Sequence, residues 1–69
     1  MKLHLYDHAG QRMIWIKPDC IRMVIGHYKD DGREFKTEIQ TEYGQFHVTE
    51  SVKSIIDAML IYNRSFLIK

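Results

Sequence analysis

Turn-forming residues divide the first two thirds of this chain into short segments in which apolar and polar residues alternate. Such alternation is typical of β-strands joined by tight turns. Turns are indicated at residues 7–10, 30–32 and 43–44, and Pro18 stands between the first hairpin and the segment after it. The pattern predicts a β-hairpin over residues 2–16 and further strands over residues 21–28, 33–41 and 45–48.

Strand register decides which side chains share a face, because a slip of one residue turns every side chain to the opposite face. In the first hairpin, a four-residue loop pairs Leu3 with Ile14. Two registers are open to the second hairpin: a two-residue turn, which sets Ile25 opposite Glu38, and a three-residue loop with Gly32 in the left-handed conformation. The three-residue loop buries more apolar surface. We therefore expect an inner face that pairs Ile21 with Thr41, Met23 with Ile39, Ile25 with Thr37, His27 with Phe35 and, across the last turn, Ile39 with Val48.

The last third of the chain has the periodicity of an amphipathic helix. Thr49 is placed to cap its N-terminus, and Glu50 lies in the first turn, where the helix dipole favours an acidic side chain. Apolar residues then recur at intervals of three and four, which gives one stripe for docking: Val52, Ile55, Ile56, Met59 and Leu60. We predict a helix over residues 50–66 and a single α+β domain, residues 1–69. In this domain the helix packs on one face of a small antiparallel β-sheet of about five strands.

A chain of 69 residues forms only a small core, so its stability is marginal unless something reinforces it. Cys20 is the only cysteine, which excludes an internal disulfide and a paired-cysteine zinc or redox site, and which suits a reducing compartment. Self-association is the remaining simple means of stabilisation. The sequence therefore favours a homo-oligomer.

The charge of the chain is nearly balanced, with ten Lys and Arg against nine Asp and Glu and a net charge of +1. Electrostatic capture of nucleic acid or anionic lipid is therefore not favoured, although aromatic residues that could stack on bases are present. No apolar run reaches the length needed to span a bilayer, and the N-terminus lacks a signal-peptide pattern. We predict an unprocessed cytoplasmic protein without membrane or nucleic-acid partners.

Two short motifs occur in the same order as in one known family. Residues 14–21 read Ile-Trp-Ile-Lys-Pro-Asp-Cys-Ile, and residues 48–52 read Val-Thr-Glu-Ser-Val at the start of the expected helix. They resemble the apolar-x-apolar-Asn-Pro-Asp-x-Ile and Val-x-Glu-Ser-Val segments of the FlbD/SwrD family of small flagellar and swarming-motility proteins, with Lys17 in place of the asparagine. The resemblance implies a non-enzymatic cytoplasmic protein that supports flagellar motor power or swarming. Short proteins of this pattern also occur in bacteriophage genomes, so a phage-encoded relative is a second expectation.

The outer face of the first hairpin is the most unusual surface that the pattern implies. It carries His4, Tyr6, Met13 and Trp15, and contiguous apolar patches with aromatic residues are typical of interfaces. The alternative is that the sheet curls and another element of the same chain covers the patch. Ile61 adds apolar surface on the back of the helix. We predict that these five residues contact a second copy of the chain, with another protein as the alternative partner.

A second functional hypothesis is sequestration of a small anionic ligand, such as a nucleotide, between protomers of a phage-type protein. Capture of an anion requires hydrogen-bond donors with positive charge, and recognition of a base requires an aromatic neighbour. The sequence offers four candidates and does not choose among them: Arg12, Lys17, Arg22 and Lys36.

Residues that could perform chemistry lack the spacing that chemistry requires. The four histidines, at positions 4, 8, 27 and 47, form no pair with helical spacing, and no carboxylate stands beside them in a ligand motif. Cys20 has no glycine-rich turn near it to build an oxyanion site, so we expect a buried structural cysteine. We predict no enzyme, no catalytic residue, no cofactor and no metal site.

Overall fold

The described part of the chain contains five short strands joined by turns, followed by one helix. The computed structural model describes the backbone of residues 1–8 and 11–67 and the side chains of residues 1–7 and 11–62. Its elements are β1 (Lys2–His4), a 3-10 turn η1 (Tyr6–His8), β2 (Met13–Trp15), a second 3-10 turn η2 (Pro18–Cys20), β3 (Ile21–Tyr28), β4 (Glu34–Thr41), β5 (Gly44–Val48) and α1 (Val52–Leu67). The predicted α+β class is confirmed, and every predicted strand is present.

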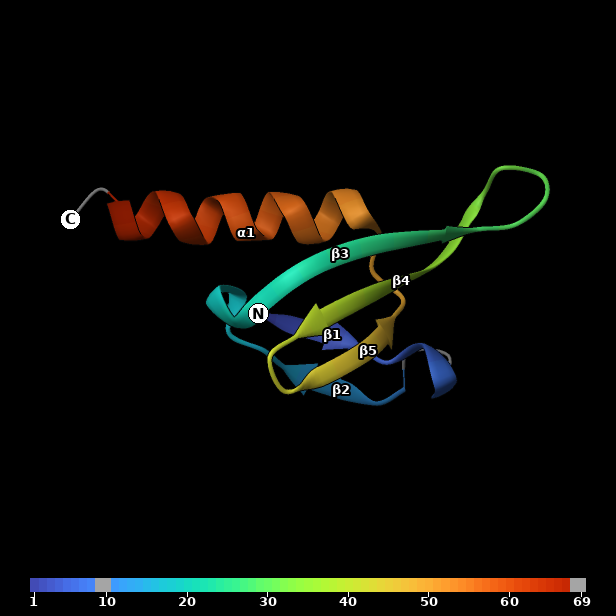
Figure 1. Ribbon diagram of the computed structural model, residues 1–69, viewed down its shortest axis with the longest axis horizontal. Coiled ribbons are helices and arrows are strands. Elements are labelled where there is room, and N and C mark those ends of the chain that lie inside the picture. The colour runs from blue at the N-terminus through green and yellow to red at the C-terminus, as the bar shows by residue number, and fades with distance from the viewer. Residues whose placement is uncertain (9–10, 68–69) are drawn as a thin grey trace.

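The strands form two antiparallel sheets instead of one. β1 pairs with β2, while β3, β4 and β5 form a three-stranded sheet in that order. Within the described residues, a bridge between Leu5 and Val48 connects the two sheets. Figure 1 shows α1 running alongside β3, with its C-terminal end projecting past the strands, and the β3–β4 turn projecting at the other end. The molecule is therefore elongated, with extents of 43 × 23 × 20 Å.

The core lies where the two sheets and the helix meet. Leu3 of β1, Ile39 of β4, Val48 of β5 and Ile55 of α1 are buried, and partly buried side chains surround them. Ile55 belongs to the predicted apolar stripe, whereas Ile56 and Leu60 of the same stripe remain exposed. Among the described side chains of α1, Ile55 therefore packs into the core with Met59 beside it.

The register of the second hairpin differs from the prediction. Ile21 lies opposite Thr41 as expected, but Val24 lies opposite Ile39 and Ile25 opposite Glu38, because extra residues bulge out of both strands. The rejected two-residue register thus holds across the middle of β3. The predicted inward placement of Met23, Ile25 and His27 is wrong, since Val24 and Gly26 occupy the inner face beside Ile39 and Thr37.

Contact with the helix explains why this register suits the chain. A side chain built on Gly26 would place its Cβ 3.1 Å from Cγ2 of Val52, so only glycine fits easily beneath the helix at this position. The bulges carry Gly26 to the inner face. Hydrophobic alternation within one hairpin contains no signal for that requirement.

The other two registers are simpler. The first hairpin pairs Leu3 with Ile14 as predicted. In the last hairpin Ile39 faces Phe46 instead of Val48, a shift of two residues that keeps the same inner face. The Thr41 hydroxyl stabilises the tighter turn, because it donates to the Gly44 carbonyl at 2.9 Å and accepts from the Tyr43 N–H at 3.0 Å.

The helix begins two residues later than predicted, and its cap is different. Ser51, not Thr49, caps the N-terminus, since its hydroxyl oxygen accepts the Ser54 N–H at 3.1 Å. The carboxylate of Glu34 on β4 accepts the Val52 N–H at 2.8 Å. Glu50 precedes the helix and interacts with His4 instead of the first turn.

Candidate functional site

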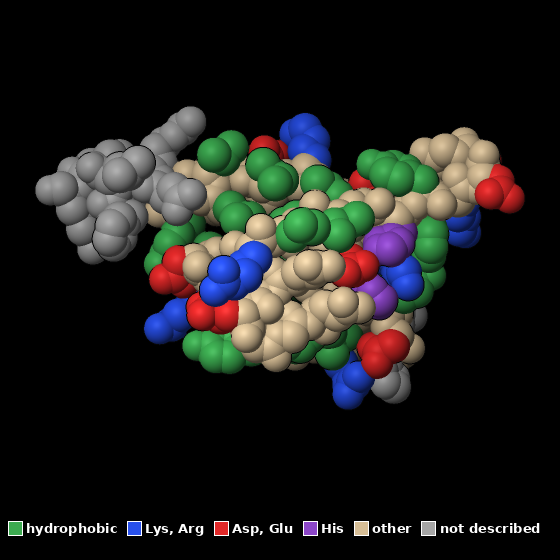
Figure 2. Space-filling view, viewed as in Figure 1, with side chains coloured by type: hydrophobic (Ala, Val, Ile, Leu, Met, Phe, Trp, Pro, Cys, Tyr) green, Lys and Arg blue, Asp and Glu red, His purple; other side chains and the backbone are tan. Residues whose placement is uncertain are grey.

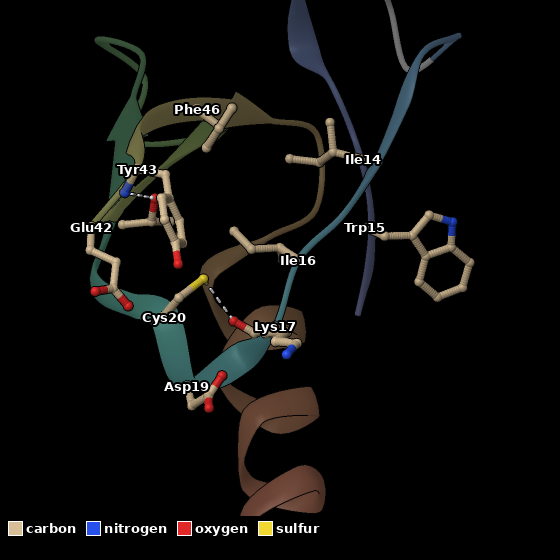
Figure 3. Close-up of a pocket in the computed structure, with 10 residues that line it drawn as sticks. Ile14, Trp15, Ile16, Lys17, Asp19, Cys20, Glu42, Tyr43 and Phe46 are labelled. Atoms are coloured by element: carbon tan, nitrogen blue, oxygen red, sulfur yellow. Dashed lines mark hydrogen bonds between the residues drawn. The ribbon is translucent and has the colours of Figure 1, made fainter.

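A hollow of about 600 Å³ opens between β2, η2 and the β4–β5 turn. Figure 3 shows the side chains of Ile14 and Ile16 pointing toward Phe46, while the Trp15 indole points away from them. This arrangement follows from the strand geometry of β2, because successive side chains alternate between the two faces. The volume falls within the range of about 300–1,000 Å³ that is usual for small-molecule pockets.

The rim of this hollow carries both signs of charge. Lys17 contributes an ammonium group, and Asp19 and Glu42 contribute carboxylates. Glu42 also lies 3.6 Å from Arg22, which lies outside the lining. The described lining residues therefore carry no net positive charge that would attract an anion.

The structure does not bring the four predicted anion-binding residues together. Among them, only Lys17 lines the hollow within the described part of the chain. Arg12 pairs with Asp7 at 2.6 Å, and Arg22 is engaged with Glu42. The Lys36 ammonium lies 5.7 Å from the ring centres of both Tyr6 and Phe35.

A second hollow, of about 570 Å³, lies on the other side of the Trp15–Lys17 segment. Tyr62 of α1 and Met1 help to line it, so this segment separates two concave surfaces. Our sequence reasoning missed Tyr62 and Tyr43 as lining residues. Tyr62 could have been found, because it follows Ile55 and Met59 on the buried stripe of the helix.

Three of the five predicted interface residues are prominently exposed. Met13 and Trp15 lie on the outer face of the β1–β2 sheet with exposed fractions of 50% and 76%, and Ile61 lies exposed on α1. Tyr6 instead leaves the strand in η1 and packs edge-on against Phe35, with ring centres 6.0 Å apart. The His4 ring shares the outer face with Met13 but is engaged by Glu50.

A cluster of histidine and glutamate side chains lies on the open face of the three-stranded sheet. His27 of β3 and His47 of β5 each direct Nε2 toward Oε1 of Glu38 on β4, at 3.0 and 3.7 Å. Figure 2 shows histidine side chains gathered beside acidic groups on this face. The sequence contains no ligand motif that indicates this carboxylate, and the sheet brings it beside the histidines. The predicted register concealed the cluster, because it placed His27 and Glu38 on opposite faces.

The environment of Glu38 favours its ionised form. A hydrogen bond from Gln40, followed by one from His27, lowers the pKa of the Glu38 carboxyl. The nearby charges of His27 and His47 lower this pKa further, and together these effects outweigh burial, which raises it. Gln40 donates to Oε2 at 2.8 Å, which leaves Oε1 to the histidines. The side chain of His8 lies outside the described residues.

Cys20 is half-buried at the edge of the first hollow, not fully buried as expected. Its thiol donates to the Lys17 carbonyl oxygen at 3.0 Å. None of the described histidines joins Cys20 in lining the hollow, so no thiol–imidazole pair forms there.

Comparison of the chain with protein-family models, with curated proteins and with solved structures finds no match. The resemblance to the FlbD/SwrD family stays a prediction from two short motifs. Within the described residues, no helix combines the length and the apolar character that are needed to span a membrane.

Proposed function

We propose that this domain is a non-enzymatic interaction module that associates with a second copy of itself through the outer face of β1 and β2. The exposure of Trp15 carries the proposal. Its indole is 76% exposed and points away from the side chains of Ile14 and Ile16. Aromatic side chains dominate the energy of interfaces because each buries about 150–250 Å² of surface.

A second copy suits this face better than a charged partner. The net charge of the chain is +1, so two copies repel each other little. Only four hydrophobic residues are fully buried among those described, and a domain with so small a core gains stability by association. The FlbD/SwrD resemblance extends the proposal to a cytoplasmic module that supports motility by protein contact, in a bacterium or as a phage-encoded relative.

Light scattering coupled to size-exclusion chromatography over a series of concentrations tests the association. We expect a mass of twice 8.3 kDa for the unchanged protein and 8.3 kDa for Trp15→Ala. Tyr43→Ala is the matched control, because Tyr43 is 82% exposed but lies on the β4–β5 turn. Circular dichroism verifies that each variant is folded. A monomeric unchanged protein at every concentration would contradict the proposal.

The first hollow favours a second candidate function, the binding of a small molecule. Its volume of about 600 Å³ and the aromatic rings of Tyr43 and Phe46 suit a nucleotide-sized ligand. On the rim, Lys17 favours a negative charge, whereas Asp19 and Glu42 oppose it. A thermal-shift screen against nucleotides tests this candidate, because a ligand at 100 times its Kd stabilises the fold by about 2.7 kcal/mol. We expect Lys17→Ala to abolish any shift caused by an anionic ligand. A screen without shifts would exclude tight nucleotide binding.

A further inference from the structure

We propose that His27, Glu38 and His47 form a binding site for one Zn²⁺ ion on the open face of the three-stranded sheet. One ligand atom from each residue can be chosen so that all three lie within 4.8 Å of one another. The three residues are far apart in the sequence and come from three different strands. This site is independent of the Trp15 face and of both hollows.

The spacing of the ligand atoms suits a tetrahedral ion. Ligands about 2.1 Å from Zn²⁺ in a tetrahedral arrangement lie about 3.4 Å from one another. The observed Nε2–Oε1 distances, 3.0 Å for His27 and 3.7 Å for His47, fall on either side of that value. Small rotations of the side chains would therefore bring the three atoms around one ion.

The sheet holds the three side chains in place. Glu38 and His47 lie directly opposite each other on β4 and β5. Ile25 lies opposite Glu38 on the other side, so His27, two residues further along β3, is the diagonal neighbour of Glu38 on the same face. Sites built on paired strands keep their geometry better than sites on loops, which lowers the cost of ordering the ligands.

Neighbouring residues orient the ligands. Gln40 donates to Oε2 of Glu38 at 2.8 Å and so directs Oε1 toward the histidines. The His27 ring packs edge-on against Phe35, with ring centres 6.4 Å apart. The Lys36 ammonium, the nearest cation by strand register, lies over the rings of Tyr6 and Phe35. The described ion pairs of Glu38 are therefore with His27 and His47 and not with Lys36.

The ligand set indicates the kind of ion and its coordination. Two imidazoles and one carboxylate favour Zn²⁺ and similar transition metals over Mg²⁺ and Ca²⁺, which prefer oxygen ligands. The Glu38 side chain is 12% exposed and the histidine side chains are about one third exposed, so the site is open on one side. Water would complete the coordination of an ion held by three protein ligands.

Isothermal titration calorimetry on protein freed of metal by a chelator tests the site, with Zn²⁺ as the probe and Mg²⁺ as the comparison. We expect one Zn²⁺ per chain, no heat with Mg²⁺, and a loss of Zn²⁺ affinity of at least about 100-fold in His27→Ala and His47→Ala. Gln40→Ala should weaken binding by about 10-fold, as is usual when a residue that orients a ligand is lost.

The second histidine–glutamate pair provides a matched control. His4 and Glu50 lie 2.7 Å apart but belong to no described three-ligand group. His4→Ala should therefore bind Zn²⁺ as the unchanged protein does. Co²⁺ gives an independent reading, since its visible absorption becomes strong in a tetrahedral site.

Three results would overturn the proposal: no Zn²⁺ binding by the unchanged protein, one ion per two chains, or equal affinity in the unchanged protein and in the triple variant His27→Ala, Glu38→Gln, His47→Ala. Circular dichroism of each variant separates loss of the site from loss of the fold. The Trp15→Ala variant should keep its Zn²⁺ site, so failure of the proposed self-association would leave this test intact.

Discussion

Glu50 connects the first strand to the start of the helix through His4. Its carboxylate accepts the His4 main-chain N–H at 2.9 Å, and its second oxygen lies 2.7 Å from Nδ1 of the His4 ring. The main chain adds a further link, because the Thr49 N–H donates to the His4 carbonyl oxygen at 2.9 Å. His4 and Glu50, which are 46 positions apart in the sequence, therefore connect β1 to the segment that leads into α1.

This contact makes the free energy of unfolding depend on pH. Burial alone would raise the pKa of Glu50, but hydrogen bonds from the ring and backbone of His4 outweigh it, and the pKa lies below the ordinary value of 4.5. The stabilisation is therefore present above pH 4.5 and is lost as the pH falls through the lowered pKa. We expect Glu50→Gln to lower the free energy of unfolding by about 1–2 kcal/mol at pH 7, as measured by urea denaturation.

The difference between Glu50→Gln and the unchanged protein should shrink as the pH falls below 4.5. Asp57→Asn provides the control, since the Lys53–Asp57 pair is exposed and should contribute less than about 0.5 kcal/mol. A stability difference for Glu50→Gln that is the same at pH 3 and pH 7 would contradict this origin.

The register of β3 can be tested with two neighbouring residues. Val24 packs against the core, while Met23 is 51% exposed on the opposite face. Val24→Ala should therefore cost about 1–2 kcal/mol, and Met23→Ala less than about 0.5 kcal/mol, in the free energy of unfolding. The register expected from the sequence predicts the reverse order. Chemical denaturation of the two variants decides between them.

Gly26 should tolerate no side chain. A Cβ there would lie 3.1 Å from Val52 and 3.2 Å from the Tyr28 ring, and the β-branched Val52 has little freedom to move aside. We expect Gly26→Ala to lower the free energy of unfolding by about 1–3 kcal/mol through this crowding. In a double-mutant cycle with Val52→Ala, the cost of Gly26→Ala should fall. Additive costs would show that the helix contact is not the cause.

The sequence was sufficient for the parts of the fold that depend on local pattern. Alternation and turn residues predicted the bounds of β3 and the pairing of Leu3 with Ile14, and periodicity predicted that Ile55 faces the core. The sequence pattern did not predict the register of β3 with β4, because an extra residue in a strand changed it. The bulges turned His27 toward Glu38, and no rule of alternation indicates which strand accommodates an extra residue.

The buried hydroxyl of Thr37 gives the last test. Glu34 accepts this hydroxyl at 2.9 Å and the Val52 N–H at 2.8 Å with the same oxygen, so one carboxylate satisfies a buried strand residue and the start of the helix. Glu34→Ala would leave both donors without this acceptor and should cost about 1–3 kcal/mol. Ser51→Ala removes the cap and should cost about 1 kcal/mol. Thr49→Ala, at the exposed position where the sequence placed the cap, should change the free energy of unfolding by less than about 0.5 kcal/mol. Thermal unfolding followed by circular dichroism ranks the stabilities of the three variants. A larger loss of stability for Thr49→Ala than for Ser51→Ala would indicate that Thr49, not Ser51, caps the helix.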